Sequence, residues 1–371
     1  MTDSAIFAYV PLSTSLLPPQ NPELGTLNSE PQPTSLFPLP TCPAIFSQMR
    51  ILIIKLSSIG DLFHALPAVH NLKVGLNADI DWVTTTAYVD LVRCFDDVDR
   101  VIGFPRKHFF QNFKTFAASL REDRYDMIVD LQGLLKSAIV GRLAHGAQRI
   151  GPSFQREGAR CFYTSVAGVR NKNRHAVLEN LDIIRHLGIE EIPHTFPVSF
   201  PEYKTETQHP RVGICPSSRW PSKNWPVERF AEVANALQTS AGASITLLGG
   251  PEDGDVCQII ESKLDHPCEN LAGKTTLPEI GGILNTMDLL IANDSGPIHM
   301  AAAVGTPALA IFGPTNPNRT GPFGDIHRVI KTAYPCPPCH HRTFQHPNIP
   351  CITGVKIYSV LDAAQQMLSS H

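Results

Sequence analysis

The chain has 371 residues, 43% of them hydrophobic and 18% charged, so it can bury the cores of two domains and is not globally disordered. A net charge of −3 excludes a protein-wide basic field for nucleic acid, and no apolar run approaches the ~18 residues of a transmembrane helix. Nine cysteines are an odd number on a long chain, and residues 1–48 lack the Lys or Arg that begins a secretory signal. These features predict a reduced, cytoplasmic protein that binds no nucleic acid.

The first 48 residues differ in texture from the rest of the chain. They hold nine of the 32 prolines, which remove backbone donors, so this stretch cannot propagate a helix or a central strand. We expect 1–48 to be a disordered Pro-rich extension, with a segment that docks a partner as the alternative. At Met49 the texture changes to a β-branched apolar run ending at Lys55, which is typical of a buried parallel strand.

Strand-like runs and helical periodicity then alternate along the chain. Strands are predicted at 51–55, 80–85, 99–104, 126–131, 211–215, 244–249, 287–292 and 307–312. Helices are predicted at 62–75, 112–124, 133–145, 226–240, 297–304 and 356–369. This alternation predicts an α/β fold with two doubly wound, Rossmann-like parallel sheets that face a central cleft.

A weaker pattern with several prolines at 190–210 places the domain junction there. The predicted organisation is an N-terminal domain over 49–200, a C-terminal domain over 201–354 and a last helix within 355–371. Ligands of such sheets bind beyond the carboxyl ends of the strands, so the loops at those ends are the candidate sites.

The first such loop, residues 56–61, ends at Asp61 and contains Ser57, Ser58 and a glycine. Its small residues let backbone N–H groups approach an anion at the start of a helix. Asp61 has two open interpretations. It is either a first-turn acid that stabilises the helix by about 0.5–2 kcal/mol, or a carboxylate general base that faces the cleft.

Two further loops have the composition of a polyanion site. Residues 215–226 place Ser217, Ser218 and Lys223 between a strand and a helix. Residues 293–299 hold a capping Asp or Ser followed by Pro297 at a helix start, where free N–H groups would point at a phosphate.

Other familiar motifs are incomplete. Residues 272–276 resemble the end of a P-loop, but Cys268 stands where the earlier glycine is needed, and no GxGxxG follows a strand. Cys336 and Cys339 match a haem-attachment spacing that requires export. With Cys351 nearby they leave open a zinc knuckle or a solvent-exposed loop.

Taken together, the loops resemble the motifs of bacterial lipopolysaccharide heptosyltransferases. The carrying segments are IIKLSSIGDLFHALP at 53–67, DLQGLLKS at 130–137, RLAHG at 142–146, NDSGPIHMAAA at 293–303 and FGPTNP at 312–317. They follow in order across most of the chain. Residues 130–163 look more like the first heptosyltransferase of the pathway, whereas the Cys-rich loop looks more like the second.

The resemblance implies a GT-B fold and inverting transfer of heptose from ADP-heptose to the inner core of lipopolysaccharide, on Kdo–lipid A or on the first heptose. It implies Asp61 as the general base, no required metal (a divalent ion such as Mg²⁺ stays possible), a monomer, and a cytoplasmic enzyme peripheral to the inner membrane. The implied donor site comprises Ser217, Ser218, Lys223, Glu252, Lys274, Thr275, Asp294, Ser295, Gly296 and His299. The implied acceptor site comprises Ser57, Ser58, Arg106, Lys107, Lys136 and Arg156.

Three alternatives remain. The nearest is a related GT-B transferase that uses another nucleotide sugar or acceptor. A binding protein without activity is disfavoured because Asp61, Lys223 and Asp294 are all present. An oxidoreductase is disfavoured by the missing glycine fingerprint.

Overall fold

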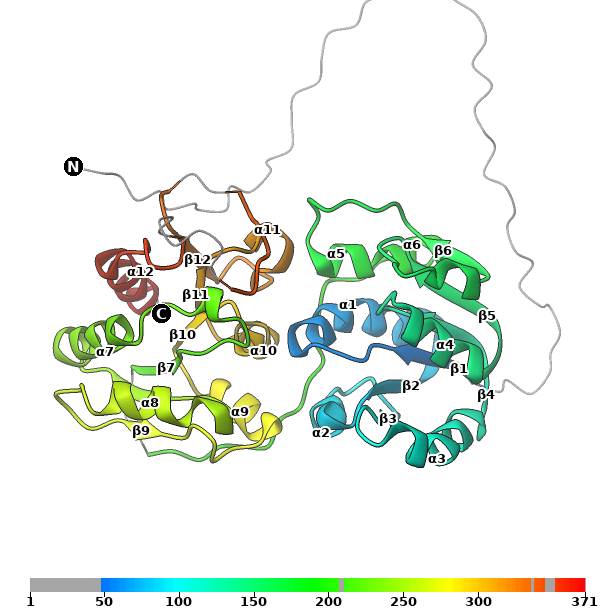
Figure 1. The fold of residues 1–371 in the computed structure, drawn as a ribbon, viewed down its shortest axis with the longest axis horizontal. Helices are drawn as coiled ribbons and strands as arrows, with labels where there is room; N and C mark the ends of the chain where they lie inside the picture. The colour runs from blue at the N-terminus through cyan, green and yellow to red at the C-terminus, as the bar shows by residue number, and fades with distance from the viewer. Residues whose placement is uncertain (1–47, 207–209, 335–336, 344–350, 371) are drawn as a thin grey trace, which may run out of the picture.

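The computed structural model describes residues 48–206, 210–334, 337–343 and 351–370, which form two halves, each built on a six-stranded parallel sheet (Figure 1). The first sheet has the order β3-β2-β1-β4-β5-β6 and the second β12-β11-β10-β7-β8-β9. The strands of the first are β1 Met49–Ile54, β2 Ala78–Thr85, β3 Arg100–Phe104, β4 Arg124–Asp130, β5 His145–Pro152 and β6 Ser165–Ala167. The strands of the second are β7 Arg211–Cys215, β8 Ser244–Leu247, β9 Glu269–Asn270, β10 Leu289–Asn293, β11 Ala308–Phe312 and β12 Arg328–Lys331.

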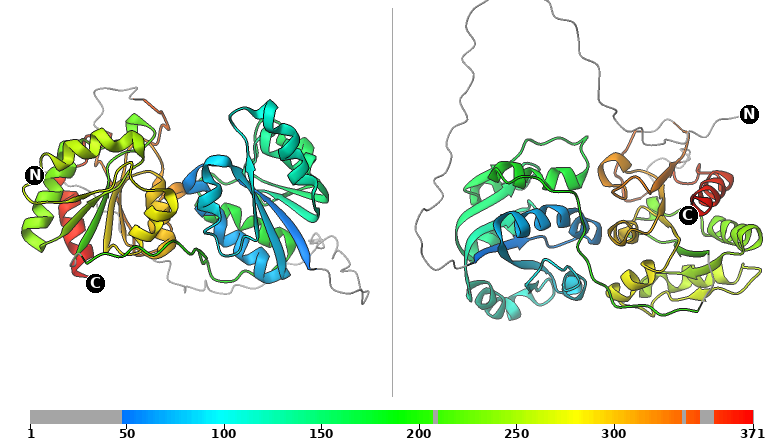
Figure 2. Two further views of the ribbon diagram at one scale, coloured as in Figure 1. Left: turned by 90° about the horizontal axis from the view of Figure 1, so that it is seen from below. Right: turned by 180° about the vertical axis from the view of Figure 1, so that it is seen from behind.

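Helices follow most of the strands and cover both faces of each sheet (Figure 2). In the first half they are α1 Ile59–Leu76, α2 Val89–Val92, α3 Phe109–Arg121, α4 Leu135–Leu143, α5 Ala176–Asn180 and α6 Asp182–Leu187. In the second half they are α7 Val227–Ala241, α8 Gly254–Glu261, α9 Leu277–Leu284, α10 Gly296–Val304, α11 Pro317–Thr320 and α12 Ile357–Ser369. None of these described helices combines the length and apolar character needed to cross a bilayer.

The eight predicted strands and six predicted helices are all present, with shifted ends. The helix predicted over 112–124 is α3, which stops at Arg121 because Arg124 already begins β4. The helix predicted over 133–145 stops at Leu143, since His145 pairs with Arg124 in the sheet. Strands β5, β6, β9 and β12 were not predicted.

The apolar core continues from one half into the other. Ile51 and Ile53 of β1 pack under α1, and the same hydrophobic cluster includes Ile283 of α9 and Met300 of α10. Leu52 and Ile54 point to the other face of the sheet, into a separate core with α3 and α4. Helix α1 therefore lies between the first sheet and the second half, whereas α3 and α4 lie on the far side of that sheet.

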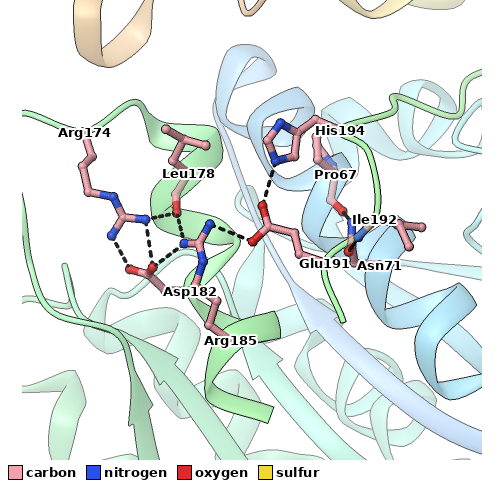
Figure 3. A network of polar contacts seen from close by, with 9 residues as sticks. All are labelled: Pro67, Asn71, Arg174, Leu178, Asp182, Arg185, Glu191, Ile192 and His194. Carbon is pink, nitrogen blue, oxygen red and sulfur yellow. Dashed lines mark hydrogen bonds and ion pairs between the residues drawn. The ribbon is translucent and has the colours of Figure 1, made fainter. Parts of the chain in front are cut away.

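A polar network fixes the segment that leaves the first half (Figure 3). Asp182 accepts hydrogen bonds from both Arg174 and Arg185, at 2.9–3.0 Å. Arg185 also pairs with Glu191 at 2.7 Å. The amide of Asn71 in α1 accepts a hydrogen bond from the backbone N–H of Ile192 at 2.9 Å, so the chain is held to α1 where it departs toward the second sheet.

Polar contacts between described residues also join the halves beyond the apolar core, among them those of α11 and the turn after it with α5. Arg319 of α11 donates to both carboxylate oxygens of Glu179 in α5, with the shorter contact at 2.6 Å. Beside it, His175 Nε2 lies 3.1 Å from the carbonyl oxygen of Gly321. Because Glu179 is buried, losing its cation would leave an uncompensated charge in the interface.

Candidate active site

Asp61 lies in the first turn of α1, at the carboxyl end of β1. Its Oδ2 accepts hydrogen bonds from the backbone N–H of Ser58 at 2.8 Å and from the Ser58 hydroxyl at 2.9 Å. This is the capping arrangement that the first-turn interpretation predicts. Within the described residues no donor contacts Oδ1, so one carboxylate oxygen remains open to a proton, and both interpretations of Asp61 are compatible with the geometry.

The loop before Asp61 is held by a side chain that sequence reasoning did not single out. Gln132 Oε1 accepts hydrogen bonds from the backbone N–H groups of Leu56 and Ser57, at 2.9 and 3.1 Å. The backbone N–H of Gln132 in turn donates a hydrogen bond to Oδ1 of Asp130, at 2.8 Å. The amide therefore links the ends of β1 and β4 and orients the Ser57-Ser58 turn.

Asp130 organises that second loop from a buried position. Its carboxylate also accepts hydrogen bonds from the Gly133 N–H, the Ser137 hydroxyl and the Tyr163 hydroxyl, at 2.7–3.0 Å. Burial raises the pKa of Asp130, although these donors act in the opposite direction. A buried carboxylate with several donors is a structural anchor, and its contacts give it no free oxygen for substrate.

Lys55 is buried at the end of β1, close to the same loops. Its ammonium donates to the carbonyl oxygen of Leu131 at 2.6 Å. Burial lowers the pKa of Lys55, while the negative charges of Asp61, Asp130 and Glu179 raise it. Lys55 thus places a buried ammonium behind the Asp61 loop.

In the second half, Lys223 and Asp294 meet at the carboxyl edge of the sheet. The Lys223 ammonium lies 2.7 Å from Asp294 Oδ2 and 4.7 Å from the centre of the Trp220 ring. Thr315, after β11, donates its hydroxyl to the same Asp294 oxygen. Three separate loops therefore meet at this ion pair.

Helix α10 begins beside this group. Ser295 occupies the N-cap position, but its hydroxyl donates to the Asn293 carbonyl at 3.2 Å and does not cap the helix. Asp294 does not cap it either, being engaged by Lys223, and Pro297 is the second helical residue. The first-turn N–H groups of α10 consequently have no side-chain cap, as the predicted phosphate site requires.

The two halves touch where the Asp61 loop meets the start of α10. A Cβ atom on Gly60 would lie 2.4 Å from Cδ2 of His299, and one on Gly296 would lie 2.9 Å from Cβ of Ile59. His299 Nδ1 also lies 3.2 Å from Nε2 of His64. This contact brings the candidate base and the candidate donor residues of α10 into one site.

Burial keeps the histidines at this contact neutral. It lowers the pKa of His299 to about 4, and together with the neighbouring His299 it lowers the pKa of His64 well below the usual 6.5. The His64 Nδ1 atom is buried and has no hydrogen-bond partner among the described residues. His299 is thus an uncharged ring under the Asp61 loop.

The remaining predicted donor residues lie along the same edge of the second sheet. The backbone N–H of Ser218 donates a hydrogen bond to Oδ1 of Asn224 at 2.8 Å. Gly273 packs on Pro251, which sets the loop of Lys274 and Thr275 beside the turn that contains Glu252. The Thr275 hydroxyl is buried and without a partner in the described part of the chain. Within the described contacts, none connects this second group directly to Lys223 and Asp294.

The four predicted acceptor cations are separate from one another. Arg106 and Lys107 follow β3, Lys136 lies in α4, and Arg156 donates its backbone N–H to the Gly133 carbonyl at 2.8 Å. All four side chains are exposed, and none forms an ion pair with a described residue. They follow β3, β4 and β5 of the first sheet, whose carboxyl ends share the edge that carries Asp61.

The hypothesis of a zinc knuckle at Cys336, Cys339 and Cys351 falls partly outside the described residues, because Cys336 is not among them. Among the residues that the structure describes, no group of three or more His, Cys, Asp or Glu side chains is arranged to hold a metal ion.

Comparison with known proteins shows to which family the chain is similar. Residues 113–349 match the model of "Glycosyltransferase family 9 (heptosyltransferase)". The chain is 28% identical to lipopolysaccharide heptosyltransferase 1 of Pseudomonas aeruginosa, over 80% of this chain and 87% of the relative. It is 30% identical to lipopolysaccharide heptosyltransferase 1 of Escherichia coli K12, over 76% of this chain and 93% of the relative.

Solved structures share the fold. E. coli heptosyltransferase WaaC with ADP superposes with a TM-score of 0.72 at 23% identity, covering 86% of this chain and all of that one. The glycosyl transferase family 9 structure from Veillonella parvula gives a TM-score of 0.77 at 23% identity, covering 87% and 98%. These likenesses confirm the α/β architecture of GT-B type that the sequence predicts.

Proposed function

The chain belongs to glycosyltransferase family 9, the heptosyltransferases, and from that premise we propose that it transfers heptose from ADP-L-glycero-D-manno-heptose to the inner core of lipopolysaccharide. Its relatives carry the names of lipopolysaccharide heptosyltransferases 1, 2 and 3, so the named activities differ among them. We propose Kdo–lipid A or the first heptose as the acceptor, and a monomeric enzyme that works in the cytoplasm at the inner membrane surface.

One observation supports a transferase most strongly. The Asp61 loop and the start of α10 are in van der Waals contact through Gly60 and His299, although they are far apart in sequence. A base on one side and an uncapped helix start on the other are what a displacement reaction needs. The acceptor hydroxyl must lose a proton at one end of the reaction axis, while a diphosphate accumulates charge at the other.

The proposed reaction is inverting. Asp61 Oδ1 accepts the proton of the acceptor hydroxyl, and that oxygen forms a bond to the anomeric carbon on the face opposite the diphosphate. The bond from the anomeric carbon to the ADP oxygen breaks, and its electron pair leaves with ADP. Lys223 and the N-terminus of α10 stabilise the leaving diphosphate, and we assign that role to them without a metal ion.

The proposed donor site extends along the edge from Lys223. Asp294 positions the Lys223 ammonium, and the loops of Glu252 and Thr275 lie over the adjoining strands β8 and β9. The buried Thr275 hydroxyl, which has no partner among the described residues, suits a polar group of the nucleotide. Arg106, Lys107, Lys136 and Arg156 supply the positive charge that an acceptor with phosphates and carboxylates requires.

A direct assay tests this function. The full chain is incubated with ADP-heptose and, in parallel, with Kdo–lipid A and with its monoheptosylated form. ADP release is coupled to a pyruvate kinase assay, and the product is weighed by mass spectrometry. A gain of one heptose on either acceptor supports the proposal. Transfer from another nucleotide sugar, with no transfer from ADP-heptose, contradicts the proposal and favours the alternative of a related GT-B transferase.

A further inference from the structure

The end of β3 and the first turn of α3 carry an aromatic ridge, Phe104, Phe109 and Phe110, that reaches solvent at Phe110. Phe110 is 93% exposed, more than any other large apolar side chain among the described residues. Its ring contacts Phe109, which contacts Phe104, which in turn contacts the buried ring of Phe116, with centroids 5.4–5.8 Å apart. The ridge is therefore anchored in the core at one end and free at the other.

The ridge is surrounded by positive charge. Residues 101–121 contain Arg106, Lys107, Lys114 and Arg121 and no Asp or Glu. Lys114 lies one turn from Phe110, on the same face of α3. Arg106, Lys107 and Lys114 are exposed, and none of them pairs with an acid of the described chain. An apolar tip among unpaired cations is the composition that binds an anionic lipid surface.

The position of the ridge fits an acceptor held in a bilayer. The ridge follows the carboxyl end of β3, which is separated from β1 by β2 alone, or about 10 Å across the sheet. Asp61 follows β1 at that same edge. Helix α3 lies on the first half, apart from the helices of the second (Figures 1 and 2), and on the face of the sheet opposite α1. A bilayer meeting α3 would leave the α1–α10 contact untouched.

We propose that this ridge, residues 104–114, is the surface by which the protein docks on an anionic phospholipid bilayer. Phe110 enters the headgroup boundary, and Lys114 and its neighbouring cations contact lipid phosphates. The inference rests on the proposed function, since it supposes a lipid-anchored acceptor, and it adds the place on the molecule where the membrane is met.

Vesicle co-sedimentation tests the docking surface without the donor. The full chain is mixed with vesicles of phosphatidylethanolamine and phosphatidylglycerol and, separately, with vesicles of phosphatidylcholine alone. Phe110→Ser should lower the partition coefficient on anionic vesicles by about ten- to a hundredfold, because a buried Phe contributes that much. Lys114→Glu should lower it roughly thirtyfold on anionic vesicles and hardly at all on phosphatidylcholine.

Two further variants make the result specific. Phe110→Trp should restore binding and report insertion by a blue shift of its fluorescence on anionic vesicles. Ile259→Ser, which removes an exposed apolar side chain from α8 in the other half, should bind as the wild type does. All variants should keep the wild-type melting temperature, because the changed side chains are exposed.

Three results would overturn the docking surface. The first is wild-type protein that does not bind anionic vesicles, or Phe110→Ser that binds as well as wild type. The second is a wild-type dimer that Phe110→Ser converts to a monomer, which would assign the ridge to a second copy. The third is a loss of turnover by Phe110→Ser on a deacylated, water-soluble acceptor, which would assign it to the acceptor sugar. If the wild type binds anionic vesicles but transfers no heptose from ADP-heptose to Kdo–lipid A or to its monoheptosylated form, the proposed function fails and the docking surface stands.

Discussion

Substituting Gly60 by alanine perturbs the contact on which the proposed site depends. The glycine lies in the first turn of α1, and its added Cβ would fall 2.4 Å from Cδ2 of the buried His299. Carbon atoms in ordinary contact stay about 3.5–4.0 Å apart, so α1 and α10 must separate by roughly 1 Å or the imidazole must leave its place.

The size of the effect follows from that displacement. Overpacking of this kind costs about 1–3 kcal/mol of unfolding free energy. A misplacement of about 1 Å between the Asp61 loop and the donor residues should lower kcat/KM by about 10²-fold. At an unobstructed helical position the same change would stabilise the helix by about 0.5–1 kcal/mol, so the sign of the effect is informative.

The assay compares Gly60→Ala with a matched control. Gly254→Ala also lies at the start of a helix, α8, where nothing is within 4 Å of the added Cβ, and it should leave turnover unchanged. In a His299→Ala background the added methyl group has room, so Gly60→Ala should cost little further activity. If Gly60→Ala keeps the wild-type kcat/KM, or lowers kcat/KM equally in the wild-type and the His299→Ala backgrounds, the added Cβ does not act through His299.

Three other predictions test separate parts of the site. Lys223→Ala should lower kcat by about 10²-fold or more because the leaving diphosphate loses its cation, and an unchanged kcat in the ADP-release assay would remove this residue from the site. Gln132→Ala leaves two backbone N–H groups of the Asp61 loop without their acceptor, so kcat should fall about tenfold or more. The affinity for ADP-heptose, measured by calorimetry, should stay within about twofold of the wild-type value. A wild-type kcat would contradict the positioning role of Gln132. Burial lowers to about 4 the pKa of His299 and that of His327, whose Nδ1 accepts a hydrogen bond from the backbone N–H of Ala308. Between about pH 6.5 and pH 4 the folded state therefore binds fewer protons than the unfolded state. The free energy of unfolding in urea should therefore fall as the pH drops through this window, by up to about 3 kcal/mol for each histidine, and equal stability at about pH 7 and pH 5 would contradict this.

Most of the strands that sequence reasoning found are buried, although the edge strand β3 was also found. Ile51–Ile54 in β1 and Ala308–Phe312 in β11 are apolar because helices cover both faces of their sheets. The missed strands lie at or near the sheet edges, where the pattern is weak. Strand β5 reads His-Gly-Ala-Gln-Arg-Ile-Gly-Pro and has exposed positions, and β9 has two residues, so neither carries an apolar run.

The candidate site could be predicted from the sequence where it depends on a local motif. Asp61, Asp294 and Lys223 stand in loops whose composition and position after a strand indicated an anion site. Gln132 acts on residues 75 and 76 positions away, and Glu179 binds an arginine 140 positions away, so their partners are set by the packing of distant loops. Lys55 could have been found from the sequence, because a lysine at the end of a buried apolar strand is unusual.

The proposed mechanism requires Asp61 to remove the proton from the acceptor hydroxyl, and the Asp61→Asn variant shows whether it does. The amide oxygen can still accept from Ser58, so the melting temperature should barely move and the helix should lose at most about 1 kcal/mol. The variant should bind ADP-heptose as the wild type does, because the proposed donor residues lie on the second half. Its turnover, measured as ADP release with acceptor present, should fall by about 10²–10⁴-fold, the range for a positioned base. Near-normal turnover of Asp61→Asn would contradict the account and leave Asp61 as a helix-capping residue alone.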